Sequence, residues 1–125
     1  MSTPDTPTPA PLPERKVVLV VDDEALVRML AAEMFEELGC EVIDAGSGLE
    51  ALERLSERPD VSLMFTDCRM PGMSGPELAE EASRRWPKLR IVLVTGYNNM
   101  GSSAWPVVWK PFDARTIEQV VRKDG

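Results

Sequence analysis

Charged side chains stand at the ends of three strand-like runs in this sequence. The run VVLVVDD ends on Asp22 and Asp23, VSLMFTD ends on Asp67, and PVVWK ends on Lys110. If these runs form parallel strands, the carboxylates and the ammonium converge at one edge of a sheet, where α/β proteins bind ligands. The cluster could then hold a divalent cation, and Asp67 could act as a nucleophile toward a phosphoryl group. Such a chain would be a switch.

Each of these residues also has a simple structural explanation when it is taken alone. An Asp after a strand often caps the next helix, which applies to Asp22 and Asp23. Thr95, at the end of a fourth run, could bond to its own backbone, and Lys110 before Pro111 could be a solvated surface lysine. Suitable side chains at four separate strand ends favour one shared site over unrelated explanations.

The residue types divide into chemical roles. Mg²⁺ prefers octahedral oxygen ligands and keeps several waters, so Asp23 and Asp67, helped by Asp22, suffice together with one backbone carbonyl. The metal would offset the repulsion between Asp67 and an incoming phosphoryl group. Lys110 would meet a phosphoryl oxygen as a point charge. Thr95 could donate a hydrogen bond to another phosphoryl oxygen only after moving, so it would report the phosphorylation.

Short β-branched runs alternate with longer helical patterns from Arg15 onward, which predicts βαβ units and a parallel sheet. The first, third and fourth runs are continuously apolar, as buried central strands are. The second run is more mixed, as an edge strand can be. The predicted strands are 16–21, 41–45, 61–66, 90–94 and 106–109.

Amphipathic helices are predicted near both ends of this pattern. A helix over residues 24–38 stops at Gly39, a common C-terminal signal, and the last helix follows Asp113, a common N-cap. The apolar face of the first helix consists of Val27, Leu30, Met34 and Leu38. The apolar face of the last helix consists of Ile117, Val120 and Val121.

Two capping boxes mark the helices in between. Ser47 and Glu50 precede a helix at 48–57, and Ser74 and Glu77 precede one that stops at Trp86 and Pro87. The connection between the fourth and fifth strands breaks the rule. It reads GYNNMGSSAW, residues 96–105, and a full crossover helix will not fit there.

Composition limits the function classes. With 125 residues, 43% of them apolar, the chain is expected to form one domain at 15–125. Five prolines in residues 1–14 predict a disordered leader or linker. A formal charge of -7 argues against binding of nucleic acid or an anionic membrane by this domain, so the expected partner is a protein.

The expected compartment is the cytoplasm. Cys40 and Cys68 have no metal-ligand spacing, and no disulfide is expected because nothing in the N-terminal residues resembles a secretory signal. No apolar run approaches the roughly 20 residues that span a bilayer.

Four segments together resemble the receiver domain of two-component response regulators. They are the Asp22-Asp23 pair, DCRMPGMSG over residues 67–75, Thr95 with Gly96, and Lys110 with Pro111. The resemblance spans roughly residues 15 to 123. It implies an α/β, flavodoxin-like (βα)5 three-layer sandwich with sheet order 2-1-3-4-5. Its fourth helix is expected to be shortened or missing here.

The resemblance also implies a role for each site residue. Asp67 would be the phosphoacceptor, Thr95 the switch hydroxyl and Lys110 the phosphate contact, and the domain would catalyse only its own phosphorylation and dephosphorylation. The implied Mg²⁺ ligands are Asp22, Asp23, Asp67 and the backbone carbonyl of Arg69.

Some positions depart from the family pattern. Val107 stands where many receivers place an aromatic switch residue three before the Lys, although Tyr97 and Trp109 are nearby. The stretch LVTGY at 93–97 resembles the atypical FATGUY subgroup, with Leu and Val in place of Phe and Ala. Arg69 and Tyr97 are bulky and could cover the acyl phosphate or could be an ordinary solvated arginine and packed tyrosine.

The implied phosphodonor is another protein, because this chain contains no histidine. A sensor histidine kinase or a histidine phosphotransfer protein would supply the phosphoryl group, for an unknown downstream protein and in a stand-alone or excised receiver. Two alternatives stay open: a constitutive receiver-like interaction module without phosphorylation, and a Mg²⁺-dependent aspartyl-phosphate phosphatase. Arg69 speaks against the phosphatase, since it occupies the place where such enzymes typically need a second acid.

Overall fold

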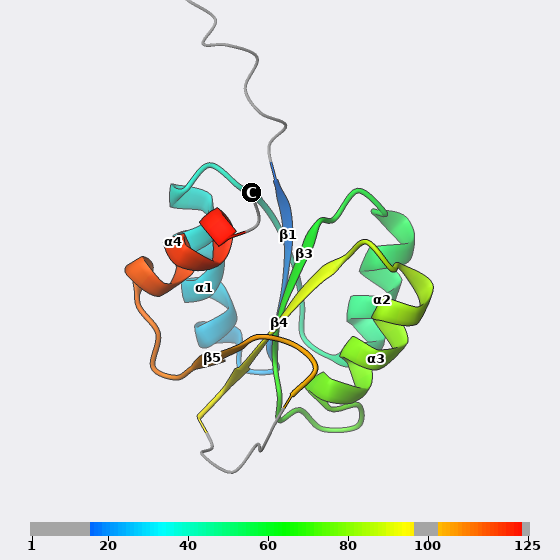
Figure 1. Ribbon diagram of the computed structural model, residues 1–125. Coiled ribbons are helices and arrows are strands. Elements are labelled where there is room, and N and C mark those ends of the chain that lie inside the picture. The colour runs from blue at the N-terminus through cyan, green and yellow to red at the C-terminus, as the bar shows by residue number, and fades with distance from the viewer. Residues whose placement is uncertain (1–15, 97–102, 124–125) are drawn as a thin grey trace, which may run out of the picture.

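The computed structural model describes residues 16–96 and 103–123 (Figure 1). Strands and helices alternate as the sequence predicts. The exception is the connection before the last strand, where the sequence also predicts a break in the pattern. The strands are β1 (Val17–Val21), β2 (Glu41–Ala45), β3 (Leu63–Asp67), β4 (Arg90–Thr95) and β5 (Val107–Trp109). The helices are α1 (Ala25–Glu37), α2 (Gly48–Glu57), α3 (Gly75–Arg85) and α4 (Ala114–Lys123).

All five strands are parallel, and their order is β2-β1-β3-β4-β5, which confirms the flavodoxin-like arrangement. Helices α1 and α4 cover one face of the sheet, and α2 and α3 cover the other (Figure 1). The residues of β1 and β3 are buried throughout, because helices lie on both faces of these central strands. The carboxyl ends of β1, β3, β4 and β5 therefore meet at one edge.

The apolar face predicted for the first helix is only partly correct. Leu30 and Leu38 are 47% and 39% exposed, whereas Ala31 and Phe35 are buried. The ring of Phe35 packs edge-on against Phe65 of β3, with 5.2 Å between the ring centroids. This aromatic pair sets the rotation of α1 about its axis, and it turns the side of the helix that carries Leu30 toward solvent.

The two capping boxes differ. Ser74 and Glu77 form the full reciprocal box at the start of α3, as predicted. At the start of α2, Ser47 Oγ accepts from the Glu50 amide, but Glu50 Oε1 accepts from the Gly46 amide at 2.7 Å instead of returning to Ser47. Only half of the predicted box is therefore present there.

The last helix begins as the sequence predicts. Asp113 Oδ1 accepts from the backbone amide and the hydroxyl of Thr116, at 3.0 Å each. Ile117 and Val120 are buried, and Val121 is partly buried. The cap and the apolar stripe together fix α4 against the face of the sheet that α1 also covers.

The connection between β4 and β5 contains no helix among its described residues, Gly96 and 103–106. Residues 97–102, including Tyr97, lie outside the described part of the chain, as does the predicted leader at 1–14. Within the described part, no helix is long and apolar enough to cross a membrane.

Candidate functional site

Asp67 is the last residue of β3 and is buried, with 7% of its surface exposed. Its backbone lies against Gly75 at the start of α3, where an added Cβ would come within 2.3 Å of the Asp67 carbonyl oxygen. The Gly75 amide also donates to the Cys68 carbonyl at 2.9 Å. Only glycine permits this approach of α3, so the turn after β3 holds the Asp67 main chain in place.

Lys110 follows β5 and reaches back to Asp67. Its Nζ lies 2.9 Å from Asp67 Oδ1 and 3.6 Å from Asp22 Oδ2. Partial burial alone would lower the pKa of Lys110, but the hydrogen bond to Asp67 and the charges of Asp67 and Asp22 outweigh it and raise the pKa. The side chain is therefore an ammonium at neutral pH, fixed between two carboxylates.

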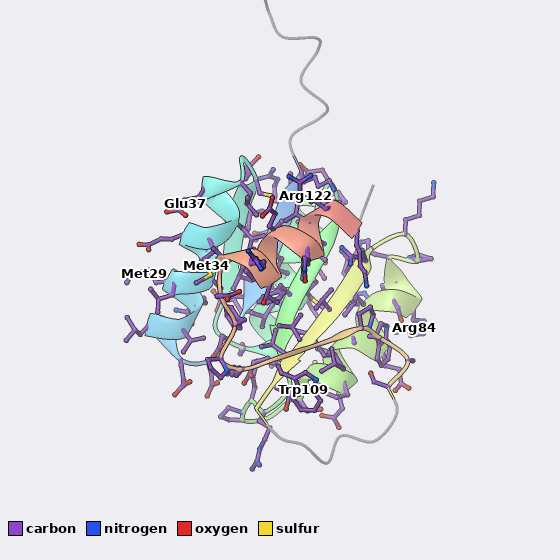
Figure 2. All side chains as sticks on the ribbon, turned by 60° about the vertical axis from the view of Figure 1, so that its left-hand side comes forward. Met29, Met34, Glu37, Arg84, Trp109 and Arg122 are labelled. Atoms are coloured by element: carbon purple, nitrogen blue, oxygen red, sulfur yellow. The ribbon has the colours of Figure 1, made fainter. Side chains whose placement is uncertain are left out.

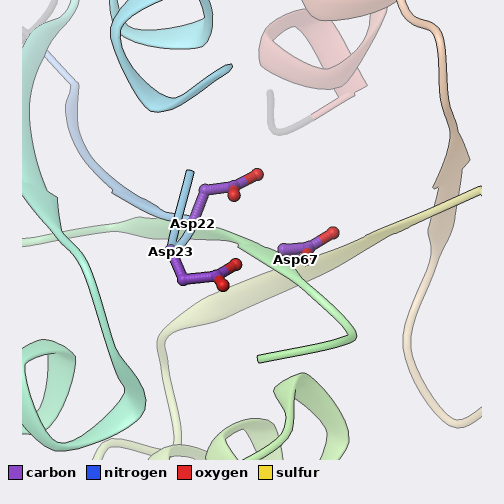
Figure 3. Close-up of side chains that lie close together, drawn as sticks. All are labelled: Asp22, Asp23 and Asp67. Atoms are coloured by element: carbon purple, nitrogen blue, oxygen red, sulfur yellow. The ribbon is translucent and has the colours of Figure 1, made fainter. Parts of the chain in front are cut away.

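Asp22 and Asp23 complete an acidic cluster with Asp67. Carboxylate oxygens of the three residues lie within 4.8 Å of one another, and Figure 3 shows the three side chains grouped where β1 and β3 end. Burial of Asp22, followed by the charge of Asp67, raises the pKa of Asp22, although its Oδ1 accepts from the Glu24 amide at 2.9 Å. We call these three acids together with Lys110 the acidic pocket.

The donor set of the acidic pocket fits a divalent cation. Three carboxylates and one ammonium leave an excess of two negative charges when all are ionised. The available ligand atoms are oxygens, which hard cations such as Mg²⁺ prefer. Arg69 lines a cavity together with Asp23, Asp67 and Lys110, so its predicted role as a carbonyl ligand is compatible with its position.

A cavity of about 510 Å³ opens beside Asp67 and gathers most of the predicted site. Asp22, which is buried, is the predicted residue that does not line it. Thr95, the last residue of β4, is also buried, and it forms a side-chain hydrogen bond with Cys68. The residues around the cavity are Asp23, Glu24, Asp67, Arg69, Thr95, Gly96 and Lys110.

The sequence pattern did not identify Arg28, which contacts the backbone of Asp22 in the acidic pocket. Its Nη1 donates to the Asp22 backbone carbonyl at 2.6 Å, and its Nε donates to Asp44 Oδ2 at 2.9 Å. The guanidinium therefore ties the turn after β1 to β2. No local pattern reveals this contact, because Arg28 and Asp44 are 16 positions apart.

Comparison with known proteins agrees with this geometry. A family model described as the response regulator receiver domain matches residues 18–122. The response regulator receiver protein CpdR of Brucella abortus (strain 2308) is 35% identical over 115 residues, covering 86% of this chain and 95% of CpdR. Sporulation initiation phosphotransferase F of Bacillus subtilis (strain 168) is 32% identical over 114 residues, covering 85% and 90%.

A solved structure gives the same result. The crystal structure of the receiver domain from hybrid histidine kinase CckA superimposes with a TM-score of 0.77 at 30% identity, covering 86% of this chain and 97% of that one. Sequence and fold thus agree over nearly all of the described residues. The chain belongs to the response regulator receiver domain family of two-component signalling.

Proposed function

We propose that this receiver domain accepts a phosphoryl group on Asp67, with Mg²⁺ in the acidic pocket, and thereby switches its interactions with other proteins. The observation that carries the proposal is the position of the Asp67 carboxylate. It borders an open cavity, has an ammonium at 2.9 Å, and has two further acids within 4.8 Å. Stability alone does not account for three acids crowded at one sheet edge.

The transfer itself is a displacement at phosphorus. A carboxylate oxygen of Asp67 attacks the phosphoryl group of a phosphohistidine, the phosphorus–nitrogen bond breaks, and its electron pair returns to the imidazole of the donor. Asp67 is left as an acyl phosphate. When it is bound, Mg²⁺ supplies charge neutralisation at the phosphoryl oxygens, with Asp22, Asp23, Asp67 and the Arg69 carbonyl as its ligands.

Lys110 and Thr95 then act on the phosphorylated state. The Lys110 ammonium, which already contacts Asp67 Oδ1, moves to a phosphoryl oxygen. The Thr95 hydroxyl exchanges its partner Cys68 for another phosphoryl oxygen. That exchange displaces the end of β4, so Thr95 transmits the chemical event to the surface.

The phosphodonor histidine must lie outside these 125 residues, since they contain no histidine. A sensor histidine kinase or a histidine phosphotransfer protein fits, and α1 offers it a docking surface. Leu26 and Met29 are 65% and 55% exposed, on a helix that begins three residues after Asp22.

The two cysteines form no disulfide within the described residues, which is consistent with a cytoplasmic protein.

The direct test is incubation with acetyl phosphate and Mg²⁺, followed by intact-protein mass spectrometry. The wild type should gain one phosphoryl group, and both Asp67→Asn and removal of Mg²⁺ with EDTA should abolish the gain. Labelling of Asp67→Asn to the wild-type level would reject Asp67 as the acceptor. A wild type that is never labelled would favour the constitutive interaction module, and catalytic turnover of phosphorylated metabolites would favour the phosphatase.

A further inference from the structure

Cys68, the residue after Asp67, lies opposite Thr95 at the carboxyl ends of β3 and β4. Asp67 is the register partner of Val94, and the Cys68 amide donates to the Val94 carbonyl at 2.9 Å, so the pairing continues one residue past β3. Cys68 and Leu93 belong to the same core cluster, and Thr95 follows Leu93 by two positions on β4. Since side chains alternate along a strand, the thiol and the Thr95 hydroxyl group lie on the same face of the sheet.

The two side chains are buried and hydrogen-bonded to each other. Cys68 is 6% exposed and Thr95 is 2% exposed, and their side chains share a hydrogen bond. Burial of a hydroxyl group is unfavourable unless the group keeps a hydrogen-bond partner. The Cys68 thiol therefore stabilises the position that Thr95 takes before phosphorylation.

A thiol is a partner that a hydroxyl group leaves easily. Sulfur is a weak acceptor and the S–H group is a weak donor, so the bond between Cys68 and Thr95 is weaker than a bond between two hydroxyl groups. A phosphoryl oxygen carries negative charge and accepts a stronger hydrogen bond. The difference between these two bonds shifts the equilibrium between the two positions of Thr95. Cys68 therefore acts on this equilibrium from the unphosphorylated side.

The backbone of Cys68 is fixed by the start of α3. The Gly75 amide donates to the Cys68 carbonyl at 2.9 Å, and a Cβ added at Gly75 would come within 2.8 Å of Cys68 Cα. The side chain of Cys68 is packed in the core cluster that also contains Leu78 and Ala79 of α3. Movement of Thr95 toward a phosphoryl group therefore breaks its bond to Cys68 instead of carrying Cys68 along.

We propose that Cys68 is a positioning residue, which holds the Thr95 hydroxyl group in the unphosphorylated state and sets how readily phosphorylation of Asp67 moves it. Cys68 is not among the described residues that line the cavity beside Asp67, so it acts through Thr95 and takes no part in the phosphoryl transfer. This role rests on the proposed function, because it requires a phosphoryl group on Asp67. A thiol gives the switch a lower threshold than a hydroxyl group would, since Thr95 leaves it more easily.

The probe is beryllofluoride, a non-covalent mimic of a phosphoryl group, titrated with Mg²⁺ into the full chain by isothermal calorimetry. Cys68→Ala removes the bond that holds Thr95 and should tighten beryllofluoride binding about threefold, whereas Cys68→Ser supplies a stronger partner and should weaken binding about threefold. Without beryllofluoride, the amide NMR signal of Thr95 in Cys68→Ala should already be shifted toward its bound position. Cys40→Ala is the matched control, since it removes a buried thiol from the other core cluster and should leave the affinity unchanged.

A second set of variants tests whether Cys68 acts through Thr95. In a Thr95→Val background the hydroxyl group is absent, so Cys68→Ala and Cys68→Ser should leave beryllofluoride affinity unchanged. Changes as large as those in the wild-type background would assign the effect to core packing and overturn the proposal. Equal affinities of the wild type, Cys68→Ala and Cys68→Ser would also overturn it, while the proposed function would stand. A wild type that binds no beryllofluoride and gains no phosphoryl group from acetyl phosphate would reject the proposed function, and the role of Cys68 with it.

Discussion

The acidic pocket and the open edge of the sheet at β5 are built in opposite ways. In the pocket, Asp22 and Asp67 are buried and held by main-chain contacts, with Lys110 between them. At the edge, a groove of about 770 Å³, which we call the β5 groove, runs between β4, α4 and the three-residue strand β5. The half-exposed Trp109 lies below β5 and the basic Arg122 of α4 lies above it (Figure 2). Chemistry at phosphorus needs fixed geometry and crowded charge, whereas an edge strand leaves backbone groups open to solvent. The molecule therefore places rigidity at the strand ends and accessibility at the sheet edge.

One element belongs to both regions. Strand β5 forms the floor of the groove, and the residue that follows it, Lys110, contacts Asp67. Trp109 pairs with Thr95 in the register of β4 and β5, and the Lys110 amide donates to the Thr95 carbonyl at 2.9 Å. A displacement of Thr95 on phosphorylation would therefore reach Trp109 through a direct backbone connection. Substitutions in one region should therefore test how far the other depends on it. We expect the largest effects on stability and binding from substitutions in the pocket and the smallest from those near the groove.

The largest effect is expected from Gly75→Ala. The new Cβ would meet the Asp67 carbonyl oxygen at 2.3 Å and Cys68 Cα at 2.8 Å, and both are backbone atoms. Overpacking of this kind should lower the free energy of unfolding by about 3 kcal/mol. Urea denaturation measures it. Gly96→Ala is the control, because within the described residues its Cβ would meet only Lys110 Cβ, at 3.8 Å. An equal loss of unfolding free energy in the two variants would show that the backbone at Asp67 is no more rigid than that at Gly96.

Lys110→Met should have the next largest effect, because it leaves two buried carboxylates without their ammonium. We expect the free energy of unfolding to fall by about 2 kcal/mol at neutral pH without metal. Since folding raises the pKa of Lys110, its contribution is complete at neutral pH and is lost as the pH rises through that pKa. Mg²⁺ should raise the thermal midpoint of the variant more than that of the wild type. If Mg²⁺ stabilised both proteins equally, the metal and the ammonium would not share these carboxylates.

A smaller effect is expected from Arg28→Met, which removes the support behind Asp22. The Asp22 carbonyl would lose its 2.6 Å donor, and we expect Mg²⁺ to bind about tenfold more weakly, as when the outer support of a metal ligand is removed. Isothermal calorimetry measures the affinity. Asp44→Asn is the matched control, since it weakens only the exposed ion pair and keeps the bond to Asp22. A tenfold loss in the control as well would assign the effect to β2 instead.

The convergence of Asp22, Asp67 and Lys110 could be predicted from the sequence because parallel strands bring their carboxyl ends to one edge. The position of a charged residue directly after each apolar run is therefore enough to predict where the site lies. The start of α4 was also predictable, because an N-cap acts within one turn. Metal binding and phosphorylation stay predictions, since they depend on groups that the chain alone does not contain.

Other features depend on contacts that local patterns do not encode. Helix α1 has apolar residues on more than one side, so periodicity alone could not choose between Leu30 and Phe35 as the buried position. Phe65, which decides this choice, lies 30 positions further along. The bond from Arg28 to Asp22 depends on how the α1 guanidinium is shared with β2. In each case a distant partner determines the geometry.

The smallest effect is expected at the groove wall, from Asp113→Ala. The Asp113 carboxylate caps α4, and the hydrogen bond from the Thr116 amide, followed by that from its hydroxyl, lowers the pKa of Asp113 below its ordinary value. A lowered pKa in the folded state gives stability that is present above the unfolded pKa and is lost as the pH falls through the folded pKa. The difference in thermal midpoint between wild type and variant should therefore be small at neutral pH and should close in acid.

Asp113→Asn separates the two parts of this effect, because it keeps an oxygen acceptor for Thr116 but carries no charge. Its midpoint should lie between those of the wild type and Asp113→Ala, and its distance from Asp113→Ala should not change with pH. In Asp113→Ala, loosening of the first turn of α4 should leave the labelling of Asp67 unchanged, because α4 contributes no residue to the acidic pocket. If labelling fell together with the thermal midpoint, the pocket and the groove would be one cooperative unit, and β5 would be part of the chemistry as well as of the sheet edge.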